Sequence, residues 1–80
     1  MKLIKFGAEW CGPCRILDAK LDKFTDCEVI RYSVDDDEVS ELLDKYKIRN
    51  IPVTILLDDN GETVNKWVGD FDVNEVKKYL

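Results

Sequence analysis

The 80-residue sequence predicts an α/β fold in which helices flank a four-stranded mixed β-sheet, in the element order βαβαββα. Three observations lead to this prediction. Short apolar segments of strand character alternate with segments in which apolar residues recur at helical spacing. An Asn-Gly pair at residues 60–61 separates two further strand-like segments. The composition is that of a globular protein, with 45% hydrophobic and 36% charged residues, and we expect one domain over residues 1–80.

The first half of the chain predicts strand, helix, strand and helix. A strand over residues 3–6 runs into a loop over residues 7–10. The helix after this loop is indicated by apolar residues at roughly helical spacing, which are Ile16, Leu17, Leu21 and Phe24. Residues 28–34 are rich in β-branched and aromatic side chains and predict the second strand. The second helix covers residues 35–47, with an i, i+3, i+4, i+7 pattern at Val39, Leu42, Leu43 and Tyr46.

The second half predicts a hairpin and a short final helix. Residues 53–57 and 63–68 are the two strands, joined by a type I′ turn around residues 59–62. A cap at Asp70 or Asp72 begins the last helix, whose apolar residues are Val73, Val76 and Leu80. The first two strands should be parallel because a helix joins them, and the hairpin adds antiparallel neighbours. We therefore expect a mixed sheet with helices on both faces.

The charge balance excludes several classes of function. The chain has a formal charge of −5, from 12 basic and 17 acidic residues, and the basic residues are scattered along it. Such a surface repels phosphate backbones, so nucleic acid is not an expected partner. Near the N-terminus, Leu3 and Ile4 are followed at once by Lys5, which is unlike a secretory signal or a membrane span. We expect a cytoplasmic monomer without a membrane partner.

Two of the three cysteines lie in the motif Trp10-Cys11-Gly12-Pro13-Cys14. An odd number of cysteines, with two of them so close together, does not fit the disulfide framework of a secreted scaffold. Closing so short a loop removes little entropy from the unfolded chain, so a disulfide between these two cysteines would add little stability. Its value would lie in being opened and closed.

The motif is expected at the N-terminus of the first helix, where unpaired N–H groups and the helix dipole stabilise a thiolate. We therefore expect a lowered pKa for Cys11, which makes it the attacking thiol, with Cys14 as the resolving thiol. Gly12 lets the chain turn, and Pro13 suits the first turn of a helix. Exchange would pass through a mixed disulfide and would need no metal and no organic cofactor.

Residues 8–15, Ala-Glu-Trp-Cys-Gly-Pro-Cys-Arg, resemble the active-site segment of thioredoxins. The resemblance continues through Arg-Asn-Ile-Pro-Val at residues 49–53 and through Asn-Gly at residues 60–61 to Trp-Val-Gly at residues 67–69. It implies a thioredoxin-like fold and the reduction of protein disulfides. The implied partners are disulfide-containing target proteins and a thioredoxin reductase or a similar reductant.

The resemblance also implies roles for residues outside the cysteine motif. Pro52 should follow a cis peptide bond and pack against the disulfide, and the backbone of Ile51 should pair with an extended substrate segment. A flat apolar rim should form the surface on which a partner protein docks. The residues of this rim are Trp10, Gly12, Pro13, Ile51, Pro52, Val68 and Gly69.

Two departures from the thioredoxin pattern leave alternatives open. The chain starts at the strand that leads to the cysteines, and its Phe6-Gly7 pair is similar to the start of glutaredoxins. A glutathione-dependent oxidoreductase is therefore the second interpretation. Lys5 stands where thioredoxins usually have a buried aspartate, and Arg31 falls near the position of its usual lysine partner. A cation there would favour both thiolates and make the protein a weaker reductant.

A zinc site and a non-enzymatic adaptor are the two other interpretations of this motif. A zinc site is disfavoured because the chain has no histidine and Cys27 has no partner at ligand spacing. Cys27 is predicted instead to be a small core residue at the start of a strand. A non-enzymatic adaptor with the same fold is the remaining alternative. Such an adaptor has no physical need to keep both cysteines, the Gly-Pro pair between them and Pro52.

Overall fold

The computed structural model describes residues 1–80, and its element order is the predicted βαβαββα. The elements are β1 (Lys2–Gly7), α1 (Gly12–Asp22), β2 (Glu28–Ser33), η1 (Asp37–Val39), α2 (Ser40–Lys45), β3 (Val53–Leu57), β4 (Thr63–Val68) and η2 (Val73–Tyr79), where η denotes a 3₁₀ helix. No helix combines the length and the apolar character that crossing a lipid bilayer requires.

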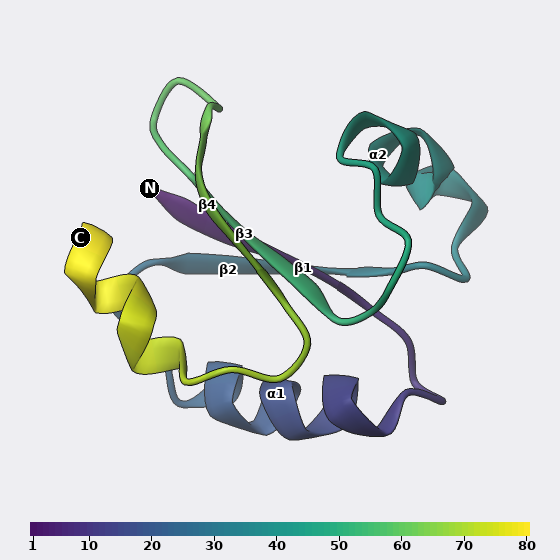
Figure 1. The fold of residues 1–80 in the computed structure, drawn as a ribbon, viewed down its shortest axis with the longest axis horizontal. Helices are drawn as coiled ribbons and strands as arrows, with labels where there is room; N and C mark the ends of the chain where they lie inside the picture. Colours follow the sequence, from purple (N-terminus) through teal and green to yellow (C-terminus); the bar gives the residue numbers. More distant parts are fainter.

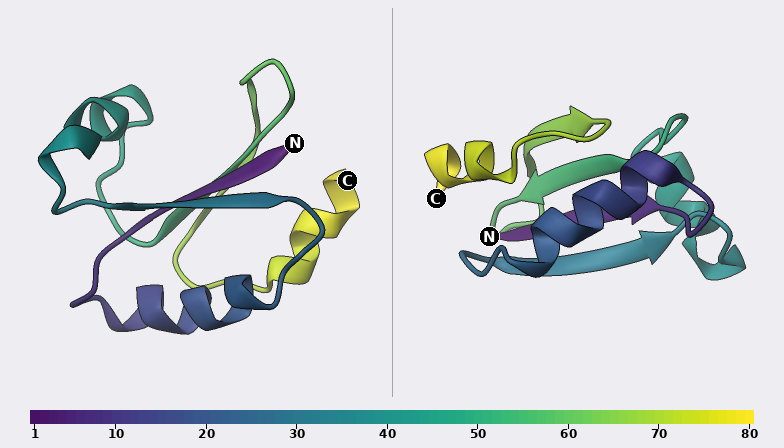
Figure 2. Two further views of the ribbon diagram at one scale, coloured as in Figure 1. Left: turned by 180° about the vertical axis from the view of Figure 1, so that it is seen from behind. Right: turned by 90° about the horizontal axis from the view of Figure 1, so that it is seen from below.

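The four strands form one mixed sheet in the order β2-β1-β3-β4 (Figure 1). β1 and β2 are parallel, whereas β3 is antiparallel to both β1 and β4. α1 and η2 cover one face of the sheet, and α2 lies against the other (Figure 2). The predicted mixed sheet with helices on both faces is therefore confirmed.

The two central strands supply side chains to a core on each face. On the α1 face, Leu3 of β1 and Leu56 of β3 pack with Leu17 of α1. On the opposite face, Ile4 of β1 packs in a cluster with Val39 of η1. Successive residues of a strand point to opposite faces, so β1 contributes to both cores. This burial on both sides fixes the strand that leads to the cysteines at the centre of the molecule.

The turn between β3 and β4 differs from the predicted type I′ turn. That turn needs a positive φ at both central residues, whereas only Gly61 has one here, at +82°. The carbonyl of Asp58 accepts a hydrogen bond from the Gly61 N–H at 3.0 Å. The Asp58 carboxylate also accepts from the N–H groups of Asn60 and Glu62, each at 2.9 Å. Asp58 therefore organises a longer turn with an irregular register, in which glycine takes the left-handed position.

Two apolar residues of the patterns that predicted the first and last helices are exposed. Ile16 is 56% exposed and Leu80, the last residue of the chain, is 52% exposed. The buried residues of α1 are Cys14, Leu17 and Leu21. Their spacing of three and then four is that of one helix face, so the buried stripe begins at a cysteine and Ile16 lies outside it.

The second predicted helix, residues 35–47, is shorter in the structure, because only η1 and α2 form within it. Asp36 caps η1, and its carboxylate accepts from the Glu38 N–H at 3.1 Å. Asp72 caps η2 in the same way by accepting from the Asn74 N–H at 3.0 Å. Of the two predicted caps for the last helix, Asp72 is therefore the correct one.

The end of α2 places a lysine in a backbone conformation that favours glycine. Lys47 has a φ of +55°, and its N–H donates to the Asp44 carbonyl at 3.3 Å. The N–H of Ile48 donates to the Leu43 carbonyl at 2.9 Å, which completes a helix C-cap that usually has glycine in the left-handed position. We expect Lys47→Gly to raise the free energy of unfolding by about 0.5–1 kcal/mol. Urea denaturation measures this change.

Asp44→Gly is the matched control, because Asp44 lies within α2 itself. Glycine there should lower the free energy of unfolding by about 0.5–1 kcal/mol, since it adds conformational freedom to the unfolded chain. If glycine destabilised the protein at both positions, the positive φ of Lys47 would not cost free energy, and the prediction would be wrong.

Candidate active site

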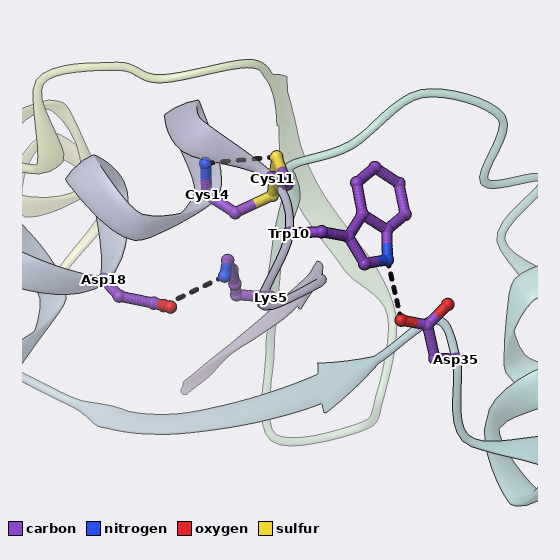
Figure 3. Close-up of a disulfide and its surroundings, with 6 residues drawn as sticks. All are labelled: Lys5, Trp10, Cys11, Cys14, Asp18 and Asp35. Carbon is purple, nitrogen blue, oxygen red and sulfur yellow. Dashed lines mark hydrogen bonds and ion pairs between the residues drawn. A yellow bond between two sulfur atoms is a disulfide. The ribbon is translucent and has the colours of Figure 1, made fainter.

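The cysteine pair lies where β1 ends and α1 begins. A disulfide joins Cys11 and Cys14, whose Cα atoms are 5.2 Å apart (Figure 3). Cys11 is the N-cap of α1, and its Sγ accepts a hydrogen bond from the Cys14 N–H at 3.2 Å. A sulfur atom thus takes the place of the oxygen that usually caps a helix. Pro13 occupies the first turn, where it costs no intrahelical hydrogen bond.

The two sulfur-bearing residues differ in their exposure. Cys11 keeps 7% of its surface exposed, whereas Cys14 has none. A substrate can therefore contact Cys11 and not Cys14. The Cys14 N–H and the positive end of the α1 dipole would stabilise a negative charge on the Cys11 sulfur. The local fold thus separates an outer cysteine from an inner one.

Two loops that are distant in the sequence meet beside the disulfide. The Ile51–Pro52 peptide bond is cis, as the resemblance implied. Ile51 packs against the small cluster that contains both cysteines. The Gly69 N–H donates to the Pro52 carbonyl at 2.7 Å and ties the end of β4 to the start of β3. The chain thereby brings all parts of the predicted rim to one end of the sheet.

The residues of the predicted rim differ in how much of their surface is exposed to solvent. Its exposed members are Trp10, Gly12, Pro13 and Val68. Trp10 is 70% exposed and Val68 is 60% exposed, which are large values for apolar side chains. Ile51 and Gly69 are half-buried. Pro52 is fully buried just before the central strand β3, so its side chain lies beneath the rim and offers no surface of its own.

A hydrogen bond that sequence reasoning missed orients Trp10. Its indole Nε1 donates to Asp35 Oδ2 at 2.8 Å, between the cysteine loop and the segment after β2 (Figure 3). The two residues are 25 positions apart, and no local pattern links them. This contact restricts the large exposed indole beside Cys11 to one orientation.

The two cations predicted near the site belong to a network of ion pairs on the α1 face. Lys5 is only 3% exposed, and its Nζ lies 2.9 Å from Asp18 Oδ1. Arg31 lies opposite Lys5 in the register of β1 and β2, and it contacts Asp18 at 3.2 Å and Asp22 at 2.7 Å. Sequence reasoning missed Asp18, although its position four residues after Cys14 puts both on one helix face.

Cys27 lies outside this site. It is half-buried just before β2 and packs against the core cluster on the α1 face, so it lies at the edge of the core and not within it as predicted. Burial raises the pKa of the Cys27 thiol, and the charges of Asp26 and Glu28 act in the same direction. Less of this thiol is therefore ionised near neutral pH than of an ordinary cysteine, which makes it a poor nucleophile.

A polar cavity opens beside the ion pairs. Its volume is about 450 Å³. The residues that line it are Lys5, Gly7, Ala8, Glu9, Arg15, Asp18, Arg31, Tyr32 and Ser33. The cavity gives solvent a path to the region between β1, β2 and α1, whereas the apolar rim gathers around Cys11.

Comparisons with known proteins agree with this geometry. The family model described as Thioredoxin matches residues 1–80. The mitochondrial thioredoxin of Mus musculus is 35% identical over 98% of this chain and 48% of that protein. A thioredoxin of Mycoplasmoides gallisepticum is 34% identical over 98% of this chain and 79% of that protein. The chain therefore spans about half the length of the mitochondrial relatives that it matches.

Solved structures show the same similarity. The solution structure of oxidised thioredoxin from Plasmodium falciparum has a TM-score of 0.81 at 30% identity and covers 98% of this chain and 79% of that one. A thioredoxin variant from Halobacterium salinarum has a TM-score of 0.80 at 34% identity and covers 98% and 69%, respectively. These matches confirm the predicted thioredoxin-like fold, and they favour the thioredoxin interpretation over the glutaredoxin one. The chain belongs to the thioredoxin family.

Proposed function

We propose that this protein reduces disulfide bonds in other proteins by dithiol–disulfide exchange, with Cys11 as the nucleophile and Cys14 as the resolving thiol. The observation that carries the proposal is the pairing of an accessible and an inaccessible cysteine at the N-terminus of α1. The outer sulfur can attack a substrate, whereas the inner one can react only with its neighbour. Membership of the thioredoxin family supports the same activity.

The exchange has two steps in which the electrons balance. The Cys11 thiolate attacks one sulfur of the substrate disulfide, that bond breaks, and a mixed disulfide forms as the first substrate thiolate leaves. The Cys14 thiolate then attacks Cys11 Sγ, which forms the intramolecular disulfide and releases the second substrate thiolate. Two electrons pass to the substrate. A reductant must then reduce the pair again, and we propose a thioredoxin reductase or a similar enzyme for this role.

The exposed part of the apolar rim is the proposed docking surface for target proteins. Trp10 and Val68 both border the loops around Cys11 and expose most of their surface. Exposed apolar groups that gather at one place are typical of protein contact sites. The backbone of Ile51 is proposed to pair with an extended substrate segment, and Gly12, Pro13 and Gly69 are proposed to let the substrate chain approach closely.

Replacing Val68 with aspartate tests this docking surface. A charge in place of an apolar contact should lower kcat/KM for a protein disulfide about tenfold, mainly through KM, which corresponds to about 1.4 kcal/mol of binding free energy. Reaction with a small aromatic disulfide should not change, because such a substrate does not need the rim. Steady-state kinetics with both substrates measures the difference.

Thr63→Asp is the matched control for the Val68 variant. Thr63 is exposed at the far end of the same strand, β4, and its replacement adds the same charge. It should leave both reactions unchanged. A similar loss in both variants would assign the effect to net charge and would contradict docking at Val68.

Insulin reduction tests the proposed activity itself. The protein is supplied with NADPH and thioredoxin reductase in one assay, and with glutathione, glutathione reductase and NADPH in another. Turnover that depends on thioredoxin reductase is expected. Turnover with glutathione alone would assign the protein to glutaredoxin-like chemistry, and no turnover in either assay would assign it to the adaptor alternative.

We also propose that the protein works as a monomer in a reducing compartment such as the cytoplasm, with residues 1–80 as one domain. A pair of cysteines that opens and closes during catalysis is typical of proteins in such compartments. The relatives include a bacterial thioredoxin and mitochondrial thioredoxins, so they favour no single compartment.

A further inference from the structure

A buried lysine lies behind the inner cysteine. Lys5 is 3% exposed and is paired with Asp18. In the sheet register Lys5 lies opposite Arg31 of β2 and opposite Thr54 of β3, so these three side chains leave the sheet on the same face. α1 covers this face and buries Cys14 against it. The inner cysteine therefore has a positive charge beneath it.

The geometry around Gly7 shows how closely this charge approaches the sulfur. A Cβ atom on Gly7 would lie 3.1 Å from Cys14 Sγ and would also collide with the end of the Lys5 side chain. The sulfur and the ammonium therefore both lie beside the position that a Gly7 side chain would take, and the end of Lys5 can occupy it because Gly7 has no side chain. Figure 3 shows the Lys5 ammonium between Asp18 and the cysteine pair.

Other charged and titratable groups surround this position, but they lie nearer to solvent. They are Asp18 and Asp22 of α1, Arg31 and Tyr32 of β2, and Glu9 and Arg15 at the cavity. The side chains of Asp18 and Arg31 are 37% and 41% exposed, whereas that of Lys5 is 4% exposed. β3 contributes only Thr54, a fully buried hydroxyl without a hydrogen-bond partner. Solvent screens the outer charges more strongly than it screens Lys5, with the exception of the Asp18 oxygen that faces Lys5, which is itself buried.

We propose that Lys5, held in place by Asp18, is a positioning residue for the resolving step, in which its ammonium stabilises the thiolate of Cys14. This inference rests on the exchange chemistry proposed above. A fully buried thiol ionises poorly because its charged form loses hydration. A cation nearby in the same water-poor environment offsets this penalty. Cys14 can thus react as a thiolate while it stays out of reach of other disulfides.

In the resolving step the Cys14 thiol gives its proton to solvent, which reaches Lys5 and Gly7 through the polar cavity. The thiolate attacks Cys11 Sγ, and the bond between Cys11 and the substrate sulfur breaks. The electron pair leaves on the substrate sulfur, which then takes up a proton. Lys5 takes no part in the proton transfer and acts only through Cys14.

Arg31 is more exposed than Lys5 and contacts the acidic residues of α1. Its guanidinium bridges Asp18 and Asp22 at the surface and so acts on the counter-ion of Lys5. Of the two cations predicted to tune the reduction potential, we assign the larger effect to Lys5. A stabilised Cys14 thiolate favours the reduced protein. It therefore raises the reduction potential at pH values above the midpoint of thiolate formation.

The test follows the ionisation of Cys14 in a protein that cannot exchange disulfides. In the reduced Cys11→Ser/Cys27→Ser variant Cys14 is the only thiol, and ultraviolet absorbance measures its thiolate during a pH titration. Adding Lys5→Met should raise the titration midpoint by about one to two pH units, the range for an opposite charge at short distance. Methionine fills similar space without a charge, and Asp18 keeps Arg31 as a partner.

Lys20→Met is the matched control in the same background. Lys20 also forms an ion pair from the α1 face, with Asp70 at 2.8 Å, but it lies further along α1 from Cys14 and is partly exposed. The net charge changes by the same amount as in Lys5→Met. The titration midpoint of Cys14 should shift by less than about 0.3 pH units, because solvent screens the charge of Lys20. An unchanged midpoint in Lys5→Met, or an equal shift in Lys20→Met, would overturn the proposal.

A second measurement leaves Lys5 in place. In Cys11→Ser, residue-specific NMR of the cysteine Cβ atoms follows Cys14 and Cys27 together. Cys14 is the more buried of the two, yet it should titrate at the lower pH if the Lys5 charge acts on it. The reverse order would overturn the proposal. Neither measurement uses turnover. The titrations therefore test the role of Lys5 separately from the proposed function, which the insulin assay tests.

In the protein with all its cysteines, Lys5→Met should slow the resolving step. A midpoint raised by one to two units lowers the thiolate fraction about 10- to 100-fold at lower pH. The more basic thiolate is also the better nucleophile, which restores part of the loss. The net decrease in the rate of this step is expected to be about 3- to 10-fold, and an unchanged rate below the midpoint would contradict the role of Lys5.

Discussion

The Cys14→Ser variant is expected to stop after the first step of exchange and to accumulate a mixed disulfide between Cys11 and its substrate. A serine hydroxyl is not ionised near neutral pH and does not displace a thiolate from a disulfide. Turnover should therefore fall by about three orders of magnitude or more, while one equivalent of substrate stays attached to Cys11. Non-reducing electrophoresis and mass spectrometry of the adduct measure both effects.

The other two cysteines provide the controls for this result. Cys11→Ser should form no adduct, because the Cys14 side chain that remains is fully buried. Cys27→Ser should keep its activity, because Cys27 packs at the edge of the core and takes no part in the exchange. Normal turnover by Cys14→Ser, or an adduct on Cys14 in the Cys11 variant, would contradict the assigned roles.

Replacing Leu17 with alanine is expected to lower the free energy of unfolding by about 2–5 kcal/mol. Leu17 has no exposed surface and attaches α1, with its cysteines, to Leu3 and Leu56 of the sheet. A protein of 80 residues has a total stability of about 4–12 kcal/mol, so this loss is a large share of it. Urea denaturation followed by circular dichroism measures the change.

Ile16→Ala is the matched control for the Leu17 variant. Ile16 is the preceding residue on α1 but is 56% exposed, so its truncation should change the stability by about 0.5 kcal/mol or less. Both residues belong to the apolar pattern that predicted this helix, and the two variants separate the buried residue from the exposed one. Equal losses in the two variants would contradict the helix face that the structure assigns to the core.

Local sequence patterns predicted the order and type of the elements because the fold agrees with them. β1 and β3 lie at the centre of the sheet and are buried on both faces, so most of their residues are apolar, with Lys5 and Thr54 as the buried exceptions. The cysteine motif was also placed correctly, because a strand followed by an amphipathic helix leaves the loop between them at the edge of the sheet. These features depend on residues that are close together in the sequence.

The features that sequence reasoning missed depend on contacts between distant residues. The Asn-Gly pair suggested a type I′ turn, but the Asp58 carboxylate holds a longer one by accepting two backbone N–H groups. Asp35 looked like part of a helix start, yet it accepts the Trp10 indole N–H across the site. No periodic pattern marks such contacts, since each needs the folded chain to bring its partners together.

Lys5 was predicted in part from the sequence and in part only from the folded structure. Its unusual position next to the cysteine loop was visible in the sequence, and so was the neighbouring Arg31. Its counter-ion was not, because Asp18 is one of many acidic residues and only the packing of α1 on β1 selects it. Once this pair is known, the lysine has a specific partner and a specific neighbour in Cys14.

The redox equilibrium of Cys11 and Cys14 tests most directly the central claim that they form a reversible two-electron couple. The protein is equilibrated in buffers of defined thiol-to-disulfide ratio, and free thiols are alkylated and counted by mass spectrometry. The two cysteines should become oxidised together, between about −300 and −180 mV, with a tenfold change in the equilibrium ratio for every 30 mV or so, while Cys27 stays a free thiol. A pair that stays oxidised far below this range, or that never closes, would contradict the account.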